Sequence, residues 1–273
     1  MQTHYVLRTL NATAKPDRDV DVLFAIQPNR TCVLFIHGFS GDATKTWSEF
    51  DRLLQTCPKF HARDIYFYGY DGLRAEMNAS AALFRDFLDR FFTSTAAFVN
   101  LSLAPDARRP LDFTYTELVI VAHSLGAVIA RRALLDATRL KASWVSSVRL
   151  VLFAPAHRGA SVAKLALEAS TSFPFLRLFG IGARFTSPLI DQLTPGSEEL
   201  RRLHDETVDA CRDGGNQHLR ATKVIIAEYE NIVKNETFCD DPPPITIPET
   251  GHTSVCKPRN DFLQPLQYLD ECL

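Results

Sequence analysis

Short, strongly apolar runs separated by helix-like segments constrain the fold of this chain more than any other feature. A run that is apolar on both faces of a strand is typical of a parallel sheet covered by helices on both sides. The sequence therefore predicts an α/β fold with a mostly parallel sheet. The expected strands lie at residues 20–26, 32–36, 65–70, 118–122, 148–153 and 223–227, and the expected helices at residues 82–92, 125–135 and 261–271, the last after a cap at Asn260.

The alternation is interrupted once, between the run that ends at Phe153 and the run that begins at Lys223. These are about seventy residues, too many for a simple crossover. Residues 172–185 within them are conspicuously apolar. We expect a single domain over residues 1–273, with a helical lid over a site inserted at about residues 156–220; an additional pair of core helices is the alternative.

The charge balance argues against nucleic acid as a partner, because 30 Lys and Arg stand against 32 Asp and Glu and leave a net charge of −2. The sequence has no G-x-G-x-x-G or P-loop motif and no zinc-ligand spacing, so we expect no nucleotide cofactor and no metal. The short basic pairs are expected on solvated faces; they are Arg108-Arg109, Arg131-Arg132 and Arg201-Arg202.

Neither a membrane-spanning run nor a signal peptide is visible in the sequence. Residues 1–10 lack an apolar stretch behind a basic start, and no apolar run approaches the length of a transmembrane helix. We therefore expect a cytoplasmic protein. If the chain were exported, Cys239 and Cys256 would be the first pair to consider for a disulfide.

The strongest motif is residues 121–126 (VAHSLG), which follows an expected strand and precedes an expected helix. A nucleophilic serine needs such a sharp turn, because the turn exposes its hydroxyl beside the helix N-terminus. Ala122 and Gly126 provide the small residues on either side that the turn requires. Ser124 is therefore the expected nucleophile; the alternative is a serine that merely caps the following helix.

A second motif, residues 37–41 (HGFSG), follows the expected strand at residues 32–36. Acyl transfer needs two fixed N–H donors for the oxygen that becomes negative in the transition state. The backbone amide of Phe39 would supply one donor and that of Leu125 the other. A plain glycine turn is the alternative at residues 37–41.

In this order, the two motifs resemble those of the α/β-hydrolase superfamily, nearer its lipase-like serine esterases. Three further segments strengthen the resemblance, and the matches run from about residue 30 to the C-terminus. Residues 153–159 (FAPAHRG) are similar to the P-x-x-G loop of those enzymes. Residues 187–197 (SPLIDQLTPGS) are similar to a segment of GPI-inositol-deacylase-like and related lipases, and residues 251–258 (GHTSVCKP) to the loop of the catalytic histidine.

The resemblance implies that His252 is the general base that activates Ser124. His157, which lies near the expected mouth of the site, is the reserve candidate. His37 is expected to shape the glycine turn, and His123 to be a packing residue, because neighbours on such a turn point apart. The remaining histidines are expected at the surface; they are His4, His61, His204 and His218.

The superfamily places its acid between the serine and the histidine along the chain. Residues 230–233 (ENIV) resemble its D-x-x-V turn and put Glu230 at the acid position, where the family more often has Asp. Glu228, Asp240 and Asp241 remain alternatives.

The resemblance thus implies a serine carboxylic-ester hydrolase that acts through Ser124, His252, Glu230 and an acyl-enzyme. The expected substrate is a small-molecule or lipid ester, with peripheral lipid contact through the lid. Two alternatives remain open: an acyltransferase or thioesterase with the same residues, or a catalytically silent binding module on the same fold.

Overall fold

In the computed structural model, the described residues are 2–6, 8–10, 20–73, 76–161, 163–165, 188–212 and 215–273. The strands within these ranges form one sheet in the order β1-β2-β4-β3-β5-β6-β7-β8. β2 pairs antiparallel with β1 and β4, and all other neighbours are parallel, which confirms the expected sheet type. The strands are β1 (Arg8–Leu10), β2 (Val20–Leu23), β3 (Thr31–Ile36), β4 (Asp64–Tyr68), β5 (Glu117–His123), β6 (Val148–Phe153), β7 (Ala221–Ala227) and β8 (Ile245–Ile247).

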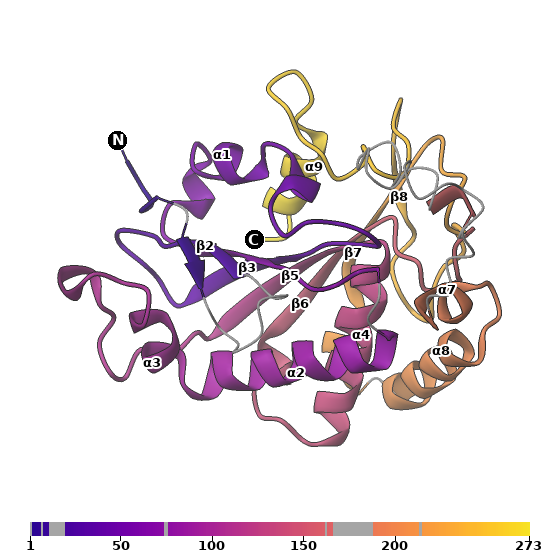
Figure 1. Ribbon diagram of the computed structural model, residues 1–273, viewed down its shortest axis with the longest axis horizontal. Coiled ribbons are helices and arrows are strands. Elements are labelled where there is room, and N and C mark those ends of the chain that lie inside the picture. Colours follow the sequence, from indigo (N-terminus) through magenta and orange to yellow (C-terminus); the bar gives the residue numbers. More distant parts are fainter. Residues whose placement is uncertain are drawn as a thin grey trace.

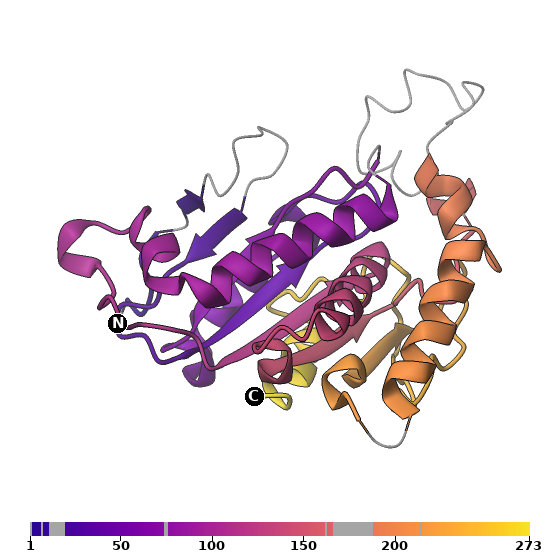
Figure 2. The ribbon, with the colours of Figure 1, turned by 90° about the horizontal axis from the view of Figure 1, so that it is seen from below.

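Helices cover both faces of the sheet, which explains why the central strands are apolar on both sides. α1 (Phe50–Leu54) and α9 (Gln264–Asp270) lie on one face, and α2 (Met77–Thr93) and α4 (Leu125–Arg139) on the other (Figure 1). Figure 2 looks onto the face that α2 and α4 cover. A short helix, α3 (Thr95–Asn100), follows α2. The expected α/β architecture is therefore confirmed.

The C-terminal helix differs from its prediction at its beginning. α9 begins at Gln264, with Leu263 at the N-cap and Pro265 in the first turn. The expected cap at Asn260 is wrong, because residues 259–262 form a tight turn in which Arg259 and Phe262 pair through their backbones. Proline is well suited to the first turn of a helix, where its missing N–H removes no hydrogen bond.

The segment between β6 and β7 contains two described helices, α7 (Pro188–Leu193) and α8 (Glu198–Cys211). α8 begins after Ser197, whose Oγ accepts a hydrogen bond from the amide of Leu200. It buries Leu203 and Thr207 and packs against α4, so this part of the segment is a crossover helix over the sheet. Residues 166–187, where the lid was mainly expected, lie outside the described residues, and the lid stays a prediction.

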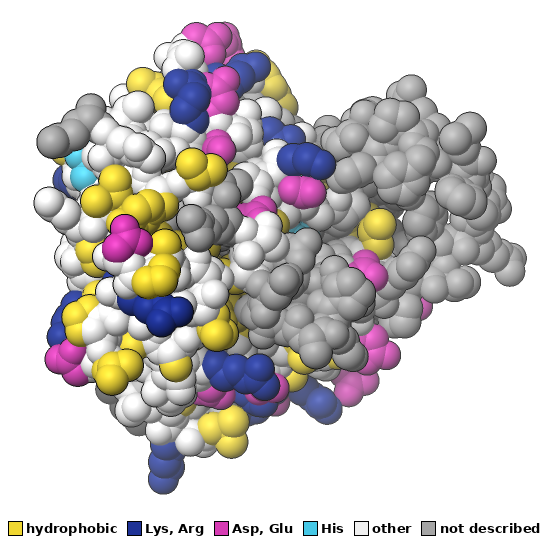
Figure 3. Space-filling model, turned by 60° about the vertical axis from the view of Figure 1, so that its left-hand side comes forward, with side chains coloured by type: hydrophobic (Ala, Val, Ile, Leu, Met, Phe, Trp, Pro, Cys, Tyr) yellow, Lys and Arg dark blue, Asp and Glu magenta, His cyan; other side chains and the backbone are white. Residues whose placement is uncertain are grey.

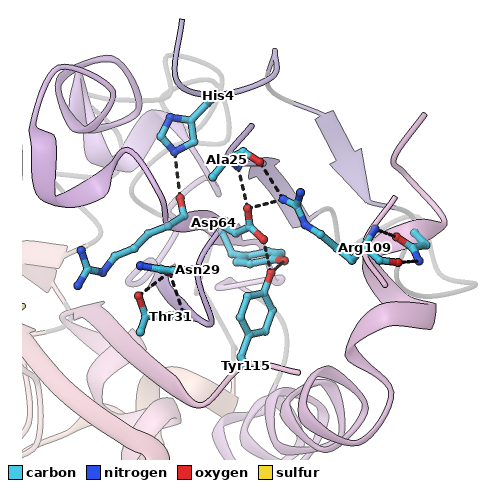
Figure 4. Close-up of polar contacts among 10 residues, drawn as sticks. His4, Ala25, Asn29, Thr31, Asp64, Arg109 and Tyr115 are labelled. Carbon is cyan, nitrogen blue, oxygen red and sulfur yellow. Dashed lines mark hydrogen bonds and ion pairs between the residues drawn. The ribbon is translucent and has the colours of Figure 1, made fainter. Parts of the chain in front are cut away.

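A buried polar network lies at the end of the sheet where β4 begins (Figure 4). Asp64 is fully buried, and its carboxylate accepts hydrogen bonds from the amide of Ala25, from Arg109 and from the Tyr115 hydroxyl at 2.7, 3.0 and 2.5 Å. Burial nevertheless raises the pKa of Asp64 above its ordinary value. The solvated position predicted for Arg109 is wrong, because its charge compensates a buried carboxylate. His4, predicted at the surface, is also buried and donates to the Arg63 carbonyl at 2.9 Å.

The prediction for Arg131 is wrong for the same reason. Its side chain is fully buried, with Nη2 2.5 Å from Asp241 Oδ2 and Nη1 2.7 Å from the carbonyl oxygen of Leu219. Arg132 is partly buried and pairs with Asp136 and Glu206. The other three arginines of the basic pairs are exposed. On the face in Figure 3, basic and acidic side chains are interspersed rather than gathered in a basic patch.

All six cysteines are free thiols, so Cys239 and Cys256 are not joined. The Cys239 thiol contacts the backbone carbonyl of His204, and the Cys256 thiol that of Thr253. Among the described helices, none has the length and hydropathy needed to cross a membrane.

Candidate active site

The turn between β5 and α4 holds Ser124 in a backbone conformation that side-chain-bearing residues rarely adopt, with φ +52° and ψ −119°. The tight packing behind the turn explains Gly126, since a Cβ there would lie 2.4 Å from the carbonyl oxygen of His37 and 2.5 Å from that of Ile36. The Ser124 hydroxyl makes no hydrogen bond to the N-terminus of α4, so the helix-cap alternative is wrong.

Three residues from distant parts of the chain form a continuous row of hydrogen bonds. Nε2 of His252 lies 3.0 Å from Ser124 Oγ, and Nδ1 of His252 lies 2.9 Å from Glu230 Oε2. A carboxylate only accepts hydrogen bonds, so Nδ1 carries a proton; in the neutral form of the ring, Nε2 then accepts from the serine hydroxyl. All three side chains are buried, with His252 at 1% and Glu230 at 0% exposure.

The turn after β7 fixes the Glu230 carboxylate. Its Oε1 accepts hydrogen bonds from the amides of Ile232 and Val233 at 2.9 and 3.1 Å, which leaves Oε2 for His252. Burial by itself raises the pKa of Glu230, but the hydrogen bond and charge of His252, together with the two amides, outweigh it and lower the pKa below its ordinary value. Glu230 is therefore a carboxylate in this site.

The other three acids are engaged elsewhere. Glu228 is exposed and accepts from the amide of Glu249 at 2.8 Å, Asp240 pairs with Arg220, and Asp241 forms the buried pair with Arg131. Of the four carboxylates that the sequence left open, Glu230 is the one that contacts His252.

The remaining histidines near the turn also have defined partners. His37 donates from Nδ1 to the Gly38 carbonyl, accepts from the Tyr70 amide through Nε2, and stacks on the Tyr70 ring. Burial lowers its pKa to about 4, so it is a neutral part of the turn, as expected. His157, the reserve base, hydrogen-bonds to the carbonyl of Ala127 and packs against Phe238 rather than facing Ser124.

His123 is closer to the site than the sequence suggested. Its Nε2–H donates to the carbonyl oxygen of His252 at 2.9 Å, and both imidazole rings border the same pocket. The partners are 129 residues apart in the sequence, so no local pattern could have revealed the contact.

The glycine turn at residues 37–41 lies against Ser124. A Cβ on Gly38 would stand 2.8 Å from the Cβ of Ser124, so the close approach requires glycine. Within the described ranges, no protein group accepts a hydrogen bond from the amides of Phe39 or Leu125. Both amides are thus free to bind a ligand oxygen.

A pocket of about 260 Å³ opens over Ser124 and His252. Apolar atoms form the larger part of its accessible wall, although most of the lining residues carry polar or charged side chains. Its lining residues are Gly38, Phe39, Ser40, Gly41, Asp42, Lys45, Thr46, His123, Ser124, Leu165, His252, Thr253 and Lys257. In the part of the chain that the structure describes, no three His, Cys, Asp or Glu side chains cluster as metal ligands do, so we assign no residue to a metal.

The fold and this site define an α/β hydrolase. A model of the alpha/beta hydrolase family matches residues 33–256, and the chain belongs to that family.

Among characterised sequences, the chain is 24% identical to Protein SERAC1 of Bos taurus over 315 aligned positions, which cover 100% of this chain and 45% of that protein. It is 23% identical to Protein SERAC1 of Homo sapiens, over 90% of this chain and 40% of that protein. The chain thus spans less than half the length of these curated relatives.

Two solved structures share the fold. The lipase BlEst2 of Bacillus licheniformis, in its mature form, superposes with a TM-score of 0.56 at 13% identity, over 96% of both chains. The peroxisomal alpha-beta-hydrolase Lpx1 of Saccharomyces cerevisiae also has a TM-score of 0.56, at 11% identity, over 100% of this chain and 90% of that one.

Proposed function

We propose that the chain is a serine hydrolase of carboxylic esters. The observation that carries the proposal is the unbroken row of hydrogen bonds from Ser124 through His252 to Glu230, with distances of 3.0 and 2.9 Å. A serine hydroxyl alone is a weak nucleophile, and a neutral imidazole within hydrogen-bond distance is the group that can activate it.

In this mechanism, His252 removes the proton from Ser124 as the serine oxygen attacks the ester carbonyl. The Glu230 carboxylate holds the imidazole in the required tautomer and stabilises the imidazolium that forms. The amides of Phe39 and Leu125 bind the negative oxygen of the tetrahedral intermediate. His252 then gives its proton to the leaving alcohol, and Ser124 is left acylated. Water that His252 deprotonates attacks this ester, the bond to Ser124 Oγ breaks, and the proton returns from His252 to Oγ as the carboxylic acid leaves.

The pocket and one structural neighbour support a substrate class. The cavity of about 260 Å³ has room for a short acyl or alcohol portion of an ester beside Ser124. One structural neighbour is a lipase, which supports an ester with a longer chain as a second substrate class. Peripheral lipid contact through the expected lid belongs to the same proposal.

A series of p-nitrophenyl esters of increasing acyl length tests the proposal. The wild-type chain should hydrolyse at least the short members, and Ser124→Ala should lose activity on all of them. Hydrolysis that persists in Ser124→Ala would contradict it.

Three other outcomes would assign a different function. If an added alcohol or amine outcompetes water for the acyl group, the chain is an acyltransferase. If only thioesters react, it is a thioesterase. If no acyl donor reacts, a catalytically silent binding module is the better account.

A further inference from the structure

His123 joins the parts of the chain that form the candidate site. It ends β5, directly precedes Ser124, and is 5% exposed. Its Nε2 lies 2.9 Å from the carbonyl oxygen of His252, and the two imidazole rings are 4.9 Å apart. A carbonyl oxygen only accepts hydrogen bonds, so the proton of the neutral His123 ring is on Nε2.

The other ring nitrogen of His123 has no such partner. Nδ1 is buried without a hydrogen bond to any described group, and a Cβ on Gly38 would stand only 3.0 Å from it. A buried acceptor without a hydrogen bond destabilises the folded state, because it loses its bond to water and gains none in return. A phenylalanine or leucine would fill the same space without that cost. Packing therefore does not explain an imidazole at this position, whereas the donor on Nε2 does.

We propose that His123 is a positioning residue that holds the His252 backbone at the distance from which its imidazole reaches both Ser124 and Glu230. This inference rests on the proposed function, because it gives His123 a part in the same reaction. The bond ties the end of the strand that precedes the nucleophile to the loop that carries the base. Displacing a reacting group by about 1 Å can lower a rate about 100-fold. Loss of this one hydrogen bond can therefore lower the rate of the reaction measurably.

The role also requires that His123 stay neutral when His252 gains a proton, because two adjacent imidazolium rings would repel each other. Burial, and after it the charge of His252, lowers the pKa of His123 well below its ordinary value. Lys257 and His37, the other charged or titratable groups that face it, act in the same direction. The His252 carbonyl opposes them through the hydrogen bond without reversing the shift.

Two substitutions separate the donor from the shape of the ring. His123→Gln keeps an N–H donor near the position of Nε2, whereas His123→Phe keeps a planar ring and removes the donor. We expect His123→Phe to lower kcat about 10- to 100-fold, with KM for a short ester nearly unchanged, and His123→Gln to restore most of the loss. Wild-type kcat in His123→Phe, or equal losses in both variants, would overturn the proposal.

The position of His252 can also be measured without activity. The Nδ1 proton between His252 and Glu230 gives a strongly downfield signal in proton NMR spectra. We expect this signal in the wild type and His123→Gln, and its broadening or loss in His123→Phe. An unchanged signal in His123→Phe would refute the positioning role. If the wild type shows the signal but hydrolyses no ester, the proposed function fails while the NMR comparison still decides the role of His123.

His4 provides a matched control, because it is a buried histidine with the same bond to a backbone carbonyl. It donates to Arg63 at 2.9 Å, at the opposite end of the sheet. His4→Phe should lower the melting temperature without changing kcat or the His252 signal. Loss of kcat in His4→Phe comparable to that in His123→Phe would show that any buried donor matters, and would overturn the specific role.

Discussion

Glu230 and His252 meet through a 2.9 Å hydrogen bond in which both side chains are almost completely buried. The Glu230 carboxylate is shielded from water, and its second oxygen already accepts hydrogen bonds from the amides of Ile232 and Val233. The pair therefore fixes both the orientation and the tautomer of the imidazole.

Glu230→Gln is expected to lower kcat by up to about 10⁴-fold, because an amide neither favours the Nδ1–H tautomer nor stabilises the imidazolium. Glu228→Gln is the matched control, since Glu228 lies two residues away, is exposed, and accepts a hydrogen bond from the backbone of Glu249 rather than from His252. Steady-state kinetics of both variants on a short ester check this. Full activity in Glu230→Gln would assign the acid elsewhere.

Neither His37 nor His123 should contribute to the acidic side of the pH profile above about pH 5. Burial lowers the pKa of His37 to about 4 and that of His123 well below its ordinary value, so both rings stay neutral there. The acidic limb of the logarithm of kcat/KM should therefore not exceed a slope of one per pH unit above about pH 5. A slope of two in that range would mean that protonation of one of these histidines also stops the reaction.

Asp241→Asn is expected to destabilise the fold while leaving catalysis intact. The substitution leaves the buried guanidinium of Arg131 without its counter-charge, which costs about 3–5 kcal/mol in comparable pairs. Urea denaturation should show this loss, whereas kcat per folded molecule should match the wild type. A folded Asp241→Asn protein without activity would revive Asp241 as the catalytic acid.

Gly126→Ala is expected to lower the melting temperature, because its Cβ would overlap the carbonyl oxygens of Ile36 and His37. Overpacking of this kind costs roughly 1–3 kcal/mol. At Gly251, a Cβ would meet no atom within 4 Å, so Gly251→Ala should have nearly the wild-type melting temperature. Thermal denaturation of the two variants makes the comparison, and equal melting temperatures would contradict the close packing behind Ser124.

The sheet was predictable because its signals are local. The apolar run of β5 lies directly before Ser124 and the small residues beside it, so strand and turn can be recognised together. A strand that is buried on both faces needs such a continuous apolar run. β8 was missed because it has only three residues and follows a run of prolines at 242–244, a composition typical of loops.

The errors concern contacts between residues that are distant in the sequence. Arg109 and Arg131 each sit in a basic pair, which locally suggests a solvated face. Their carboxylate partners lie 45 and 110 residues away, and only the folded chain brings them together. The hydrogen bond between His123 and His252 could not be predicted for the same reason. The two residues are 129 positions apart, and the motif around Ser124 does not indicate the contact.

The proposed reaction requires that Ser124 be a nucleophile activated by His252. A fluorophosphonate probe, followed by mass spectrometry of the labelled peptide, measures this reactivity. We expect stoichiometric modification of Ser124 in the wild type, much slower modification in His252→Ala, and none in Ser124→Ala. Modification of another residue, or labelling of Ser124→Ala at the wild-type rate, would contradict it.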